Sequence, residues 1–253
     1  VVYSVGVLSE LGRNTFEATQ HEGAERVARL AAAQGVGRLV HVSAIGADAA
    51  SGIDYARTKG LGEAAVLAQY PDAVILRPSI LFGPEDDFFN RFAGMAVMSP
   101  VLPVAGAETR FQPVYVDDVA KAAQKALEGG AKAGVYELGG PETKTLRELL
   151  QDMLAVIQRR RLIVNMPFGL AKFFAWWFDL WQSLSGGLIK APLTVDQVKN
   201  LARDNVVAAD ARGFGDLGID TTAMAAVLPD YLYRFRVAGQ YAAIKASAKN
   251  LKT

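Results

Sequence analysis

The first half of the chain alternates between short apolar runs and longer segments in which apolar residues recur every three or four positions. The runs 1–8, 38–43 and 73–78 are rich in Val, Leu and Ile, so each is predicted to be a buried strand. Segments 16–34 and 55–70, which lie between them, have helical periodicity. Strand, helix, strand, helix, strand at this spacing predicts an α/β fold with a parallel sheet.

Helix-capping signals continue this pattern to about residue 158. The acidic residues 85–87 are predicted to begin a helix, because carboxylates in a first turn suit the helix dipole; a catalytic carboxylate cluster is the alternative. Asp117 is predicted to cap the helix that follows a short strand. Thr145 and Glu148 have the spacing of a capping box at the start of a helix over 146–158.

An aromatic segment, 168–181, contains all three Trp of the chain. Its aromatic side chains are distributed around the predicted helix, which is typical of a buried helix, and at about 14 residues it is too short to cross a bilayer. Two environments stay open: the interior of the protein's own second lobe, or the surface of partner subunits or of a membrane. The flanking Lys172 and Lys190 favour an interfacial position.

These patterns divide the chain into three parts. Residues 1–158 are predicted to form the main α/β domain, 159–230 a small lobe that contains the aromatic helix, and 231–253 a basic tail. The tail carries five basic residues and no acidic one. It is predicted to be either a solvated helix or a segment that binds acidic protein surfaces or anionic lipid.

The amino-acid composition argues against several classes of function. The chain has no Cys, which excludes disulfides, thiol catalysis and thiolate metal sites, and its two His argue against a histidine metal cluster. Lys and Arg number 27 against 26 Asp and Glu, and this net charge of +1 gives no support to nucleic-acid binding. The sequence therefore predicts no metal site and no nucleic-acid partner.

Tyr55 and Lys59 are four residues apart in a predicted helix and therefore share one face. An ammonium beside a phenol stabilises the phenolate, so the sequence predicts a Tyr55 pKa below its usual value of about 10 and a role in proton transfer. An exposed helix with an ordinary Tyr and an ordinary Lys is the alternative. Gly6, Ser43 and Pro78 end or follow predicted strands, where parallel sheets bind ligands, and this agreement favours a site.

Several pieces of the chain together resemble the extended and atypical short-chain dehydrogenase/reductases. They occur in that superfamily's order: Gly23, Val42-Ser43, the Tyr55–Lys59 pair, Leu76-Arg77-Pro78, Phe82-Gly83-Pro84 and Val114 to Val119. Within the superfamily, residues 77–86, 89–92 and 194–199 are similar to the nucleotide-binding accessory subunits of respiratory complex I. The resemblance implies a Rossmann-like, doubly wound parallel sheet with a small C-terminal lobe.

The resemblance also implies a ligand and partners. The ligand is NADPH or NADH, held for structure and not turned over. The partners are other complex I subunits and a membrane surface with anionic lipid. The implied location is peripheral, on the cytoplasmic side of a bacterial inner membrane or the matrix side of the mitochondrial inner membrane. An active NAD(P)-dependent reductase or epimerase, and an assembly factor without cofactor, are the alternatives.

The site residues follow from the same resemblance. In an active enzyme, Tyr55 is the acid/base, Lys59 binds the nicotinamide ribose and Ser43 bonds to the reacting group. Arg77 is expected to be a structural residue at a strand end. The implied cofactor-binding residues are Gly6, Ser43, Tyr55, Lys59, Pro78 and Ser79.

The chain departs from the superfamily at its start. Members open with a strand and a glycine-rich turn that holds the dinucleotide pyrophosphate, and no such turn precedes Val1. Because the chain begins at what resembles the fourth strand, we expect a fragment of a longer protein that holds half of a dinucleotide site. The run 1–8 is then expected to be an exposed apolar sheet edge.

Overall fold

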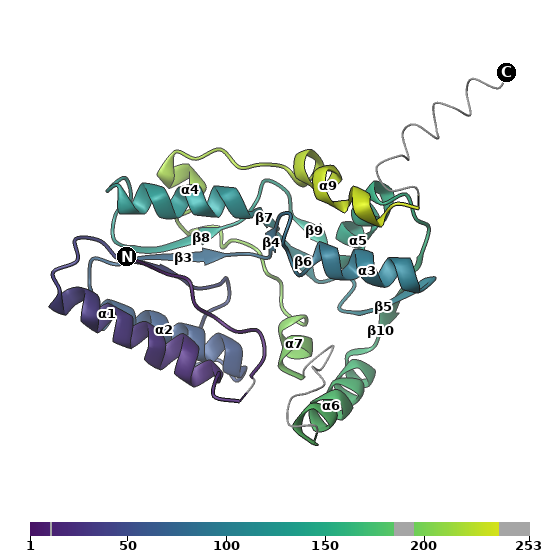
Figure 1. The fold of residues 1–253 in the computed structure, drawn as a ribbon, viewed down its shortest axis with the longest axis horizontal. Helices are drawn as coiled ribbons and strands as arrows, with labels where there is room; N and C mark the ends of the chain where they lie inside the picture. The colour runs from purple at the N-terminus through teal and green to yellow at the C-terminus, as the bar shows by residue number, and fades with distance from the viewer. Residues whose placement is uncertain (11, 185–194, 238–253) are drawn as a thin grey trace.

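A four-stranded parallel sheet forms the centre of the molecule, in the spatial order β1-β2-β3-β8 (Figure 1). The computed structural model describes residues 1–10, 12–184 and 195–237. The strands are β1 (Val2–Tyr3), β2 (Val40–Val42), β3 (Val74–Pro78) and β8 (Gly134–Leu138). The predicted α/β fold with a parallel sheet is confirmed.

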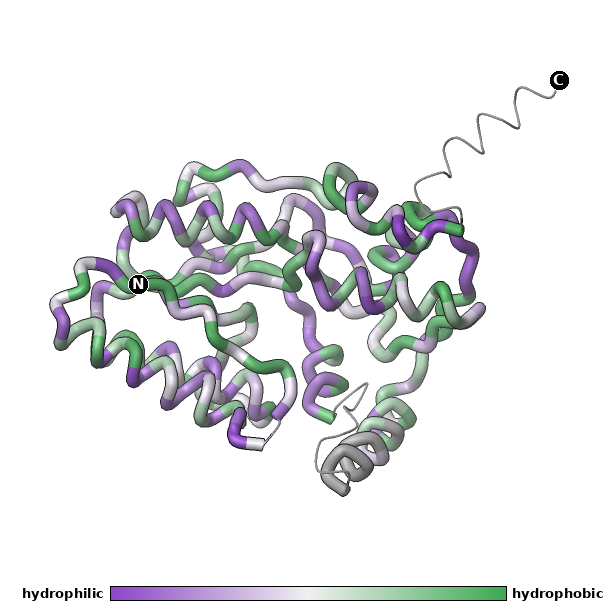
Figure 2. Tube along the Cα trace, in the orientation of Figure 1, coloured by the Kyte–Doolittle hydropathy of each residue, from purple (hydrophilic) through white to green (hydrophobic). Residues whose placement is uncertain are grey.

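Helices cover both faces of this sheet (Figure 1). One face carries the π-helical turns of η1 (Glu17–Glu22), α1 (Gly23–Ala33) and α2 (Asp54–Gln69), and the other carries α4 (Val116–Leu127) and α8 (Phe214–Leu217). Because successive strand side chains point to opposite faces, Leu39 packs under α1 and α2 while Val40 packs under α4. Figure 2 shows these central strands as largely apolar, as expected for strands buried on both faces.

A second apolar core forms the lobe beside the sheet. Three helices build it with one parallel strand pair: α3 (Phe89–Met98), α5 (Leu146–Val156), α9 (Met224–Leu232), β5 (Val101–Ala105) and β10 (Leu162–Met166). Two short pairs lie between the lobe and the main sheet: β4 (Leu81–Phe82) with β7 (Val114–Tyr115), and β6 (Arg110–Phe111) with β9 (Lys144–Thr145). The domain boundary at residue 158 stays a prediction, and segments on both sides of it share this core.

The lobe is closed by the last described residues. The 3-10 turn η2 (Tyr233–Phe235) follows α9, and Arg236 Nε donates to the Val156 carbonyl at 2.8 Å. Two of the five basic residues predicted in the tail, Arg234 and Arg236, therefore bond to the lobe itself. The rest of the predicted tail lies outside the described residues.

The helix starts confirm one of the three capping predictions. Thr145 and Glu148 form the capping box of α5, with the Thr145 side chain accepting from the Glu148 amide. The acidic trio does not form the first turn of a helix as expected, because α3 begins at Phe89 and its first turn holds no acidic residue. Asp86 lies before the helix, and its Oδ1 accepts from the Asn90 amide at 3.0 Å.

The cap predicted at Asp117 is wrong. Helix α4 begins at Val116, and the residue before it caps nothing with its side chain. The neighbouring Asp118 is the buried carboxylate, and it accepts from the Thr222 amide at 2.6 Å. This bond holds the segment before α9 against α4, a long-range contact that local spacing does not reveal.

The strand predicted over 1–8 is shorter than expected. Only Val2 and Tyr3 pair with β2, and the chain then leaves the sheet and crosses the end of β2. The expected exposed apolar edge is present, since Val2, Val5 and Leu8 are exposed. Beyond Tyr3 the chain is held by helices: the Val7 carbonyl accepts from Gln20 of η1, and the Leu8 carbonyl accepts from Gln197 of α7.

Helix α6 (Phe168–Leu184) has two different faces. Ala171 and Ala175 are fully buried against the chain, whereas Trp176 is 54% and Trp177 is 43% exposed. Burial of the aromatic side chains in the protein's own lobe, one of the two predicted environments, is therefore wrong for these two residues. The small side chains form the packed face because they let α6 approach α7 (Val195–Asn200) closely. Among the described helices, none has the length and apolarity needed to cross a membrane.

Two glycines give a test of how tightly the helices pack. A Cβ on Gly62 of α2 would lie 2.0 Å from the Gln20 carbonyl oxygen, whereas a Cβ on Gly94 of α3 would meet nothing within 4 Å. We expect Gly62→Ala to destabilise the protein by about 1–3 kcal/mol through backbone displacement. Gly94→Ala is the control and should stabilise it by about 0.5–1 kcal/mol, because Ala is the better helix former. Denaturant unfolding measures both; equal effects would contradict the close approach.

Candidate functional site

The carboxyl ends of β1, β2 and β3 meet on one side of the sheet, and the predicted site residues follow them. Ser43 comes directly after β2, and its amide donates to the Leu76 carbonyl at 2.7 Å. The Ile45 amide donates to the Pro78 carbonyl at 3.1 Å, so the loop after β2 is fixed against the end of β3. Helix α2 starts at Asp54 and brings Lys59 to the end of β2.

Lys59 is the charged centre of this site. Its side chain is only 5% exposed, and Nζ donates to the Val42 carbonyl at 3.4 Å. A Cβ on Gly6 would lie 3.1 Å from Nζ, so the loop after β1 passes directly over the ammonium. Burial lowers the Lys59 pKa to about 8, an effect that Glu63 partly opposes. The structure thus brings Gly6, the end of β2 and Lys59 together.

Tyr55 lies on the first turn of α2, with its ring edge-on to Phe16 at 5.9 Å between centroids. Burial raises the Tyr55 pKa to about 12, so the predicted lowering is wrong. The physical reason is that desolvation of the phenol outweighs any attraction to Lys59, whose ammonium is bonded to the β2 carbonyl. Tyr55 is therefore a neutral hydrogen-bonding group near pH 7.

Two buried polar side chains beneath Lys59 lack partners. The Ser43 hydroxyl and both ring nitrogens of His41 make no hydrogen bond within the described part of the chain. His41 stacks on Tyr3 with 5.6 Å between ring centroids, and burial together with the Lys59 charge lowers its pKa to about 4. Unpaired buried polar atoms carry a desolvation penalty of about 1–3 kcal/mol each, so a hydroxyl or water at this position would be stabilised.

Ser79, which follows Pro78, is drawn away from the other site residues. Its hydroxyl lies 2.6 Å from Asn205 Oδ1 and 3.2 Å from the Asn205 carbonyl. Asn205 Nδ2 in turn donates to the Ile45 carbonyl at 3.5 Å. No sequence pattern points to Asn205, because 126 residues separate it from Ser79. The role of Pro78 and Ser79 beside a nicotinamide stays a prediction.

A buried ion pair fixes α2 to the sheet. The Arg77 guanidinium binds Glu63 of α2 through two bonds of 2.9 and 2.6 Å, and its third nitrogen lies 3.4 Å from Glu137 of β8. Two parallel bonds define the orientation of both groups. The expected structural role of Arg77 fits these contacts.

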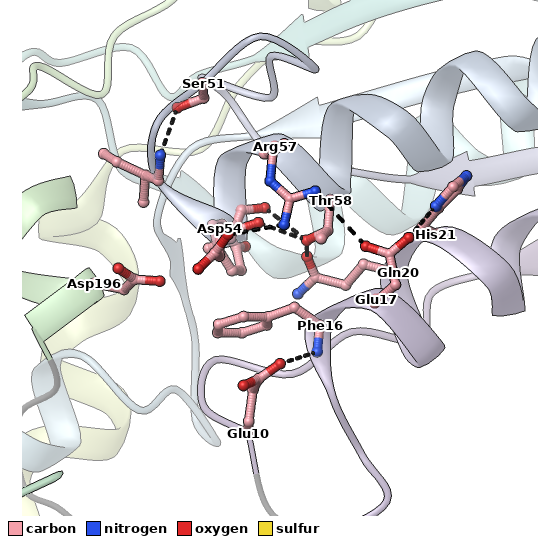
Figure 3. A network of polar contacts seen from close by, with 12 residues as sticks. Glu10, Phe16, Glu17, Gln20, His21, Ser51, Asp54, Arg57, Thr58 and Asp196 are labelled. Carbon is pink, nitrogen blue, oxygen red and sulfur yellow. Dashed lines mark hydrogen bonds and ion pairs between the residues drawn. The ribbon is translucent and has the colours of Figure 1, made fainter.

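A second polar network holds the start of α2 (Figure 3). Arg57 pairs with Asp54 at 2.8 Å and lies 3.8 Å from Glu17 of η1, which also contacts His21. The picture shows these groups between η1 and α2. They fix the start of the helix that carries Tyr55 and Lys59.

Comparison with known proteins agrees with this geometry. A family model described as the RmlD substrate binding domain matches residues 51–165. Among solved structures, a dTDP-glucose 4,6-dehydratase from Streptomyces venezuelae with NAD bound has a TM-score of 0.64 at 20% identity, covering 99% of this chain and 75% of that one. The enzyme WbmG of Bordetella bronchiseptica, in complex with NAD, has a TM-score of 0.62 at 16% identity, with 92% and 70% covered.

This chain has the Rossmann-like α/β fold of these NAD-bound structures. The architecture expected from the sequence is thereby confirmed. Lys59 and Ser43 lie at the carboxyl end of β2, and open parallel sheets generally bind ligands outside the carboxyl ends of their strands.

Curated relatives narrow the resemblance within this fold. The chain is 33% identical to the mitochondrial NADH dehydrogenase (ubiquinone) 1 alpha subcomplex subunit 9 of Arabidopsis thaliana, over 94% of this chain and 61% of the relative. It is 31% identical to the mitochondrial NADH-ubiquinone oxidoreductase 40 kDa subunit of Neurospora crassa, over 90% and 58%. The predicted similarity to complex I accessory subunits is confirmed, and the chain spans about three fifths of those relatives' length.

The buried imidazole of His41 predicts how the stability of the protein depends on pH. An unfolded His titrates near pH 6.5 and folded His41 near about 4, so between these values the unfolded chain binds more protons. Stability should therefore fall as the pH falls from 6.5 to 4, by up to about 3 kcal/mol from this residue.

His41→Phe, which can still stack on Tyr3, should remove that part of the acid sensitivity in unfolding measured from pH 7 to 4. His21→Gln is the matched control, since His21 is the other histidine and lies on the partly exposed η1. If both variants lose stability with acid as the unaltered protein does, His41 is not the buried neutral group described above.

Proposed function

We propose that this chain is the nucleotide-holding part of an accessory subunit of respiratory complex I, NADH:ubiquinone oxidoreductase. The similarity to relatives that bear the names of complex I subunits supports the assembly. The observation that carries the nucleotide role is the buried Lys59 ammonium at the strand ends, with one weak partner and an unpaired Ser43 hydroxyl below it. We propose NADPH or NADH as the ligand, and solved neighbours of the fold with NAD support this class.

The residues present fit one half of such a ligand. Lys59 can donate to ribose hydroxyls, Ser43 supplies an unpaired hydroxyl, and Gly6 leaves room for close approach because it has no side chain. Tyr55 can add a neutral hydrogen bond from the same face of α2. A bound nicotinamide cofactor supplies hydride chemistry in an active enzyme, whereas here these residues bind and orient it.

Two features favour a structural ligand over catalysis. The raised pKa of Tyr55 makes its phenol a poor proton donor and leaves almost no phenolate to act as a base near pH 7. The Ser79 hydroxyl is committed to Asn205 and is buried. An active NAD(P)-dependent reductase is the second candidate, because the Tyr55–Lys59 pair is retained; it requires that ligand binding lower the Tyr55 pKa.

We further propose that α6 docks this subunit on the peripheral arm near the membrane. Phe173, Trp176 and Trp177 project outward with the exposed Lys172 on the same helix. Aromatic rings and a cation at one surface suit the interface between a protein or lipid core and anionic headgroups. The proposed location is the matrix side of the mitochondrial inner membrane or the cytoplasmic side of a bacterial one.

Nucleotide binding is tested on the full-length protein with NADPH and NADH. Lys59→Met should weaken binding at least about tenfold, because it removes a charge-assisted bond worth about 1.5–3 kcal/mol. Lys125→Met is the control, since Lys125 is exposed on α4 across the sheet. Fluorescence titration measures the dissociation constants. Unchanged binding in the Lys59 variant would contradict a nucleotide site at Lys59.

The structural role is tested in the purified complex. The bound nucleotide should keep its oxidation state while the enzyme oxidises NADH, as followed by extraction and quantification after many turnovers. Oxidation and reduction of the bound nucleotide at the rate of turnover would favour the catalytic alternative. Recovery of the protein from membranes as a lone soluble dimer would contradict the proposed assembly.

The exposed face of α6 gives a separate test. A double variant, Trp176→Gln with Trp177→Gln, should lower retention of the protein in complex I about tenfold or more, since each ring buries apolar area worth about 1.5–3 kcal/mol. Val97→Gln with Met98→Gln, exposed apolar residues at the end of α3, is the matched control. Native gels with quantitative blotting measure retention; equal retention of both variants contradicts docking through α6. Binding to vesicles of anionic phospholipid distinguishes a lipid contact from a protein contact.

A further inference from the structure

Gln20 is a buried polar residue that the proposed nucleotide role does not use. It lies in the π-helical turns of η1, facing α2, and is only 1% exposed. Both the nitrogen and the oxygen of its carboxamide make a hydrogen bond, and Figure 3 shows the bond to Thr58. π-helical turns are rare in proteins, and those that occur are frequently found at functional sites.

The two bonds of Gln20 reach the neighbours of two site residues. Nε2 donates to the Val7 carbonyl at 2.8 Å, and Oε1 lies 2.9 Å from the Thr58 hydroxyl. Val7 directly follows Gly6, and Thr58 directly precedes Lys59. A single side chain thus holds both the loop over the ammonium and the helix that carries it.

The backbone of Gln20 is fixed as firmly as its side chain. Its carbonyl oxygen lies so close to α2 that a Cβ on Gly62 would be 2.0 Å away. The Thr58 hydroxyl also lies 2.8 Å from the Asp54 carbonyl, which restricts its rotation. The loop itself is less firmly packed, since residues 4–6 and 8–10 are exposed. Within it, the Val7 carbonyl accepts a hydrogen bond from the Gln20 side chain.

We propose that Gln20 is a positioning residue of the nucleotide site, which sets the separation between Gly6 and Lys59 by holding Val7 and Thr58 at once. The inference rests on the proposed nucleotide role of Lys59. Without the carboxamide, the Val7 carbonyl loses its donor, and the loop over the ammonium keeps only the bonds further along it, from Gln197 to the Leu8 carbonyl and from the Phe16 amide to Glu10. The space above Lys59, which the ligand requires, is then no longer fixed.

The test compares four variants of the full-length protein. Gln20→Leu removes both bonds, Thr58→Val removes one of them, and Thr58→Ser keeps the hydroxyl. Gln69→Leu is the matched control, since the Gln69 carboxamide, at the end of α2 away from Lys59, joins α2 to Glu25 of α1 at 3.4 Å. Two measurements are made: hydrogen exchange of the amides of residues 4–10 without nucleotide, and the dissociation constant for NADPH.

Gln20→Leu should speed exchange in residues 4–10 and weaken NADPH binding, each about tenfold, as expected for a lost buried hydrogen bond of about 1.4 kcal/mol. Thr58→Val should change both in the same direction, Thr58→Ser should restore both, and Gln69→Leu should change neither. A purely structural role would lower thermal stability in all these variants without rescue of binding by Thr58→Ser. If Gln20→Leu does not fold, the Thr58 pair decides the question.

Unchanged loop exchange together with unchanged NADPH binding in Gln20→Leu or Thr58→Val would overturn the inference while the proposed function stands. If the unaltered protein binds neither NADPH nor NADH, the proposed nucleotide role and the positioning role both fail. In that case faster loop exchange in Gln20→Leu would still identify Gln20 as a structural clamp.

Discussion

The burial of one ammonium group is the constraint on which this site depends. Lys59 can lie beneath the loop after β1 only because α2 approaches its neighbours closely. Gly60 and Gly62 make this possible, since a Cβ on either would lie within 2.2 Å of backbone atoms in the facing segments. The Arg77–Glu63 pair then anchors the same helix from the other side. The penalty for desolvating the ammonium is therefore offset by contacts made elsewhere along α2.

This arrangement also bears on the proposal that the site holds a ligand and does not transform it. A desolvated ammonium with one long bond gains partners when hydroxyl groups arrive, so binding is favourable. The phenol of Tyr55 is kept protonated by the same burial, and its ring packs against Phe16. Burial thus strengthens the case for binding and weakens the case for proton transfer.

Much of the fold could be predicted from the sequence, because its helices and strands depend on local patterns of residues. The apolar runs 38–43 and 73–78, the helical periodicity and the Thr145–Glu148 box each depend on residues within one element, and the structure has all of them. The ends of apolar runs also predict that Gly6 and Lys59 meet at the end of β2, as the structure shows, while the binding role of these residues stays a prediction.

What could not be predicted depends on distant contacts and on solvation. Asn205 reaches Ser79 across 126 residues, and Gln20 reaches Thr58 across 38, so spacing gives no signal for either. The sign of the Tyr55 pKa shift was wrong because spacing places a charge near the phenol but does not report how much water is lost. The environment of α6 stayed open for a similar reason. The alanines that form its packed face are small, so the pattern of apolar residues does not distinguish that face from the exposed one.

One carboxylate links the site to the far segment of the chain. Glu137 receives Arg77 on one oxygen and the Ala208 amide, at 2.9 Å, on the other. A neighbouring protein that displaced the loop around Ala208 would therefore pull on the guanidinium that fixes α2. Under the proposed function, thermodynamic linkage would make such an effect reciprocal: the factor by which assembly changes the affinity for the nucleotide is also the factor by which the nucleotide changes assembly.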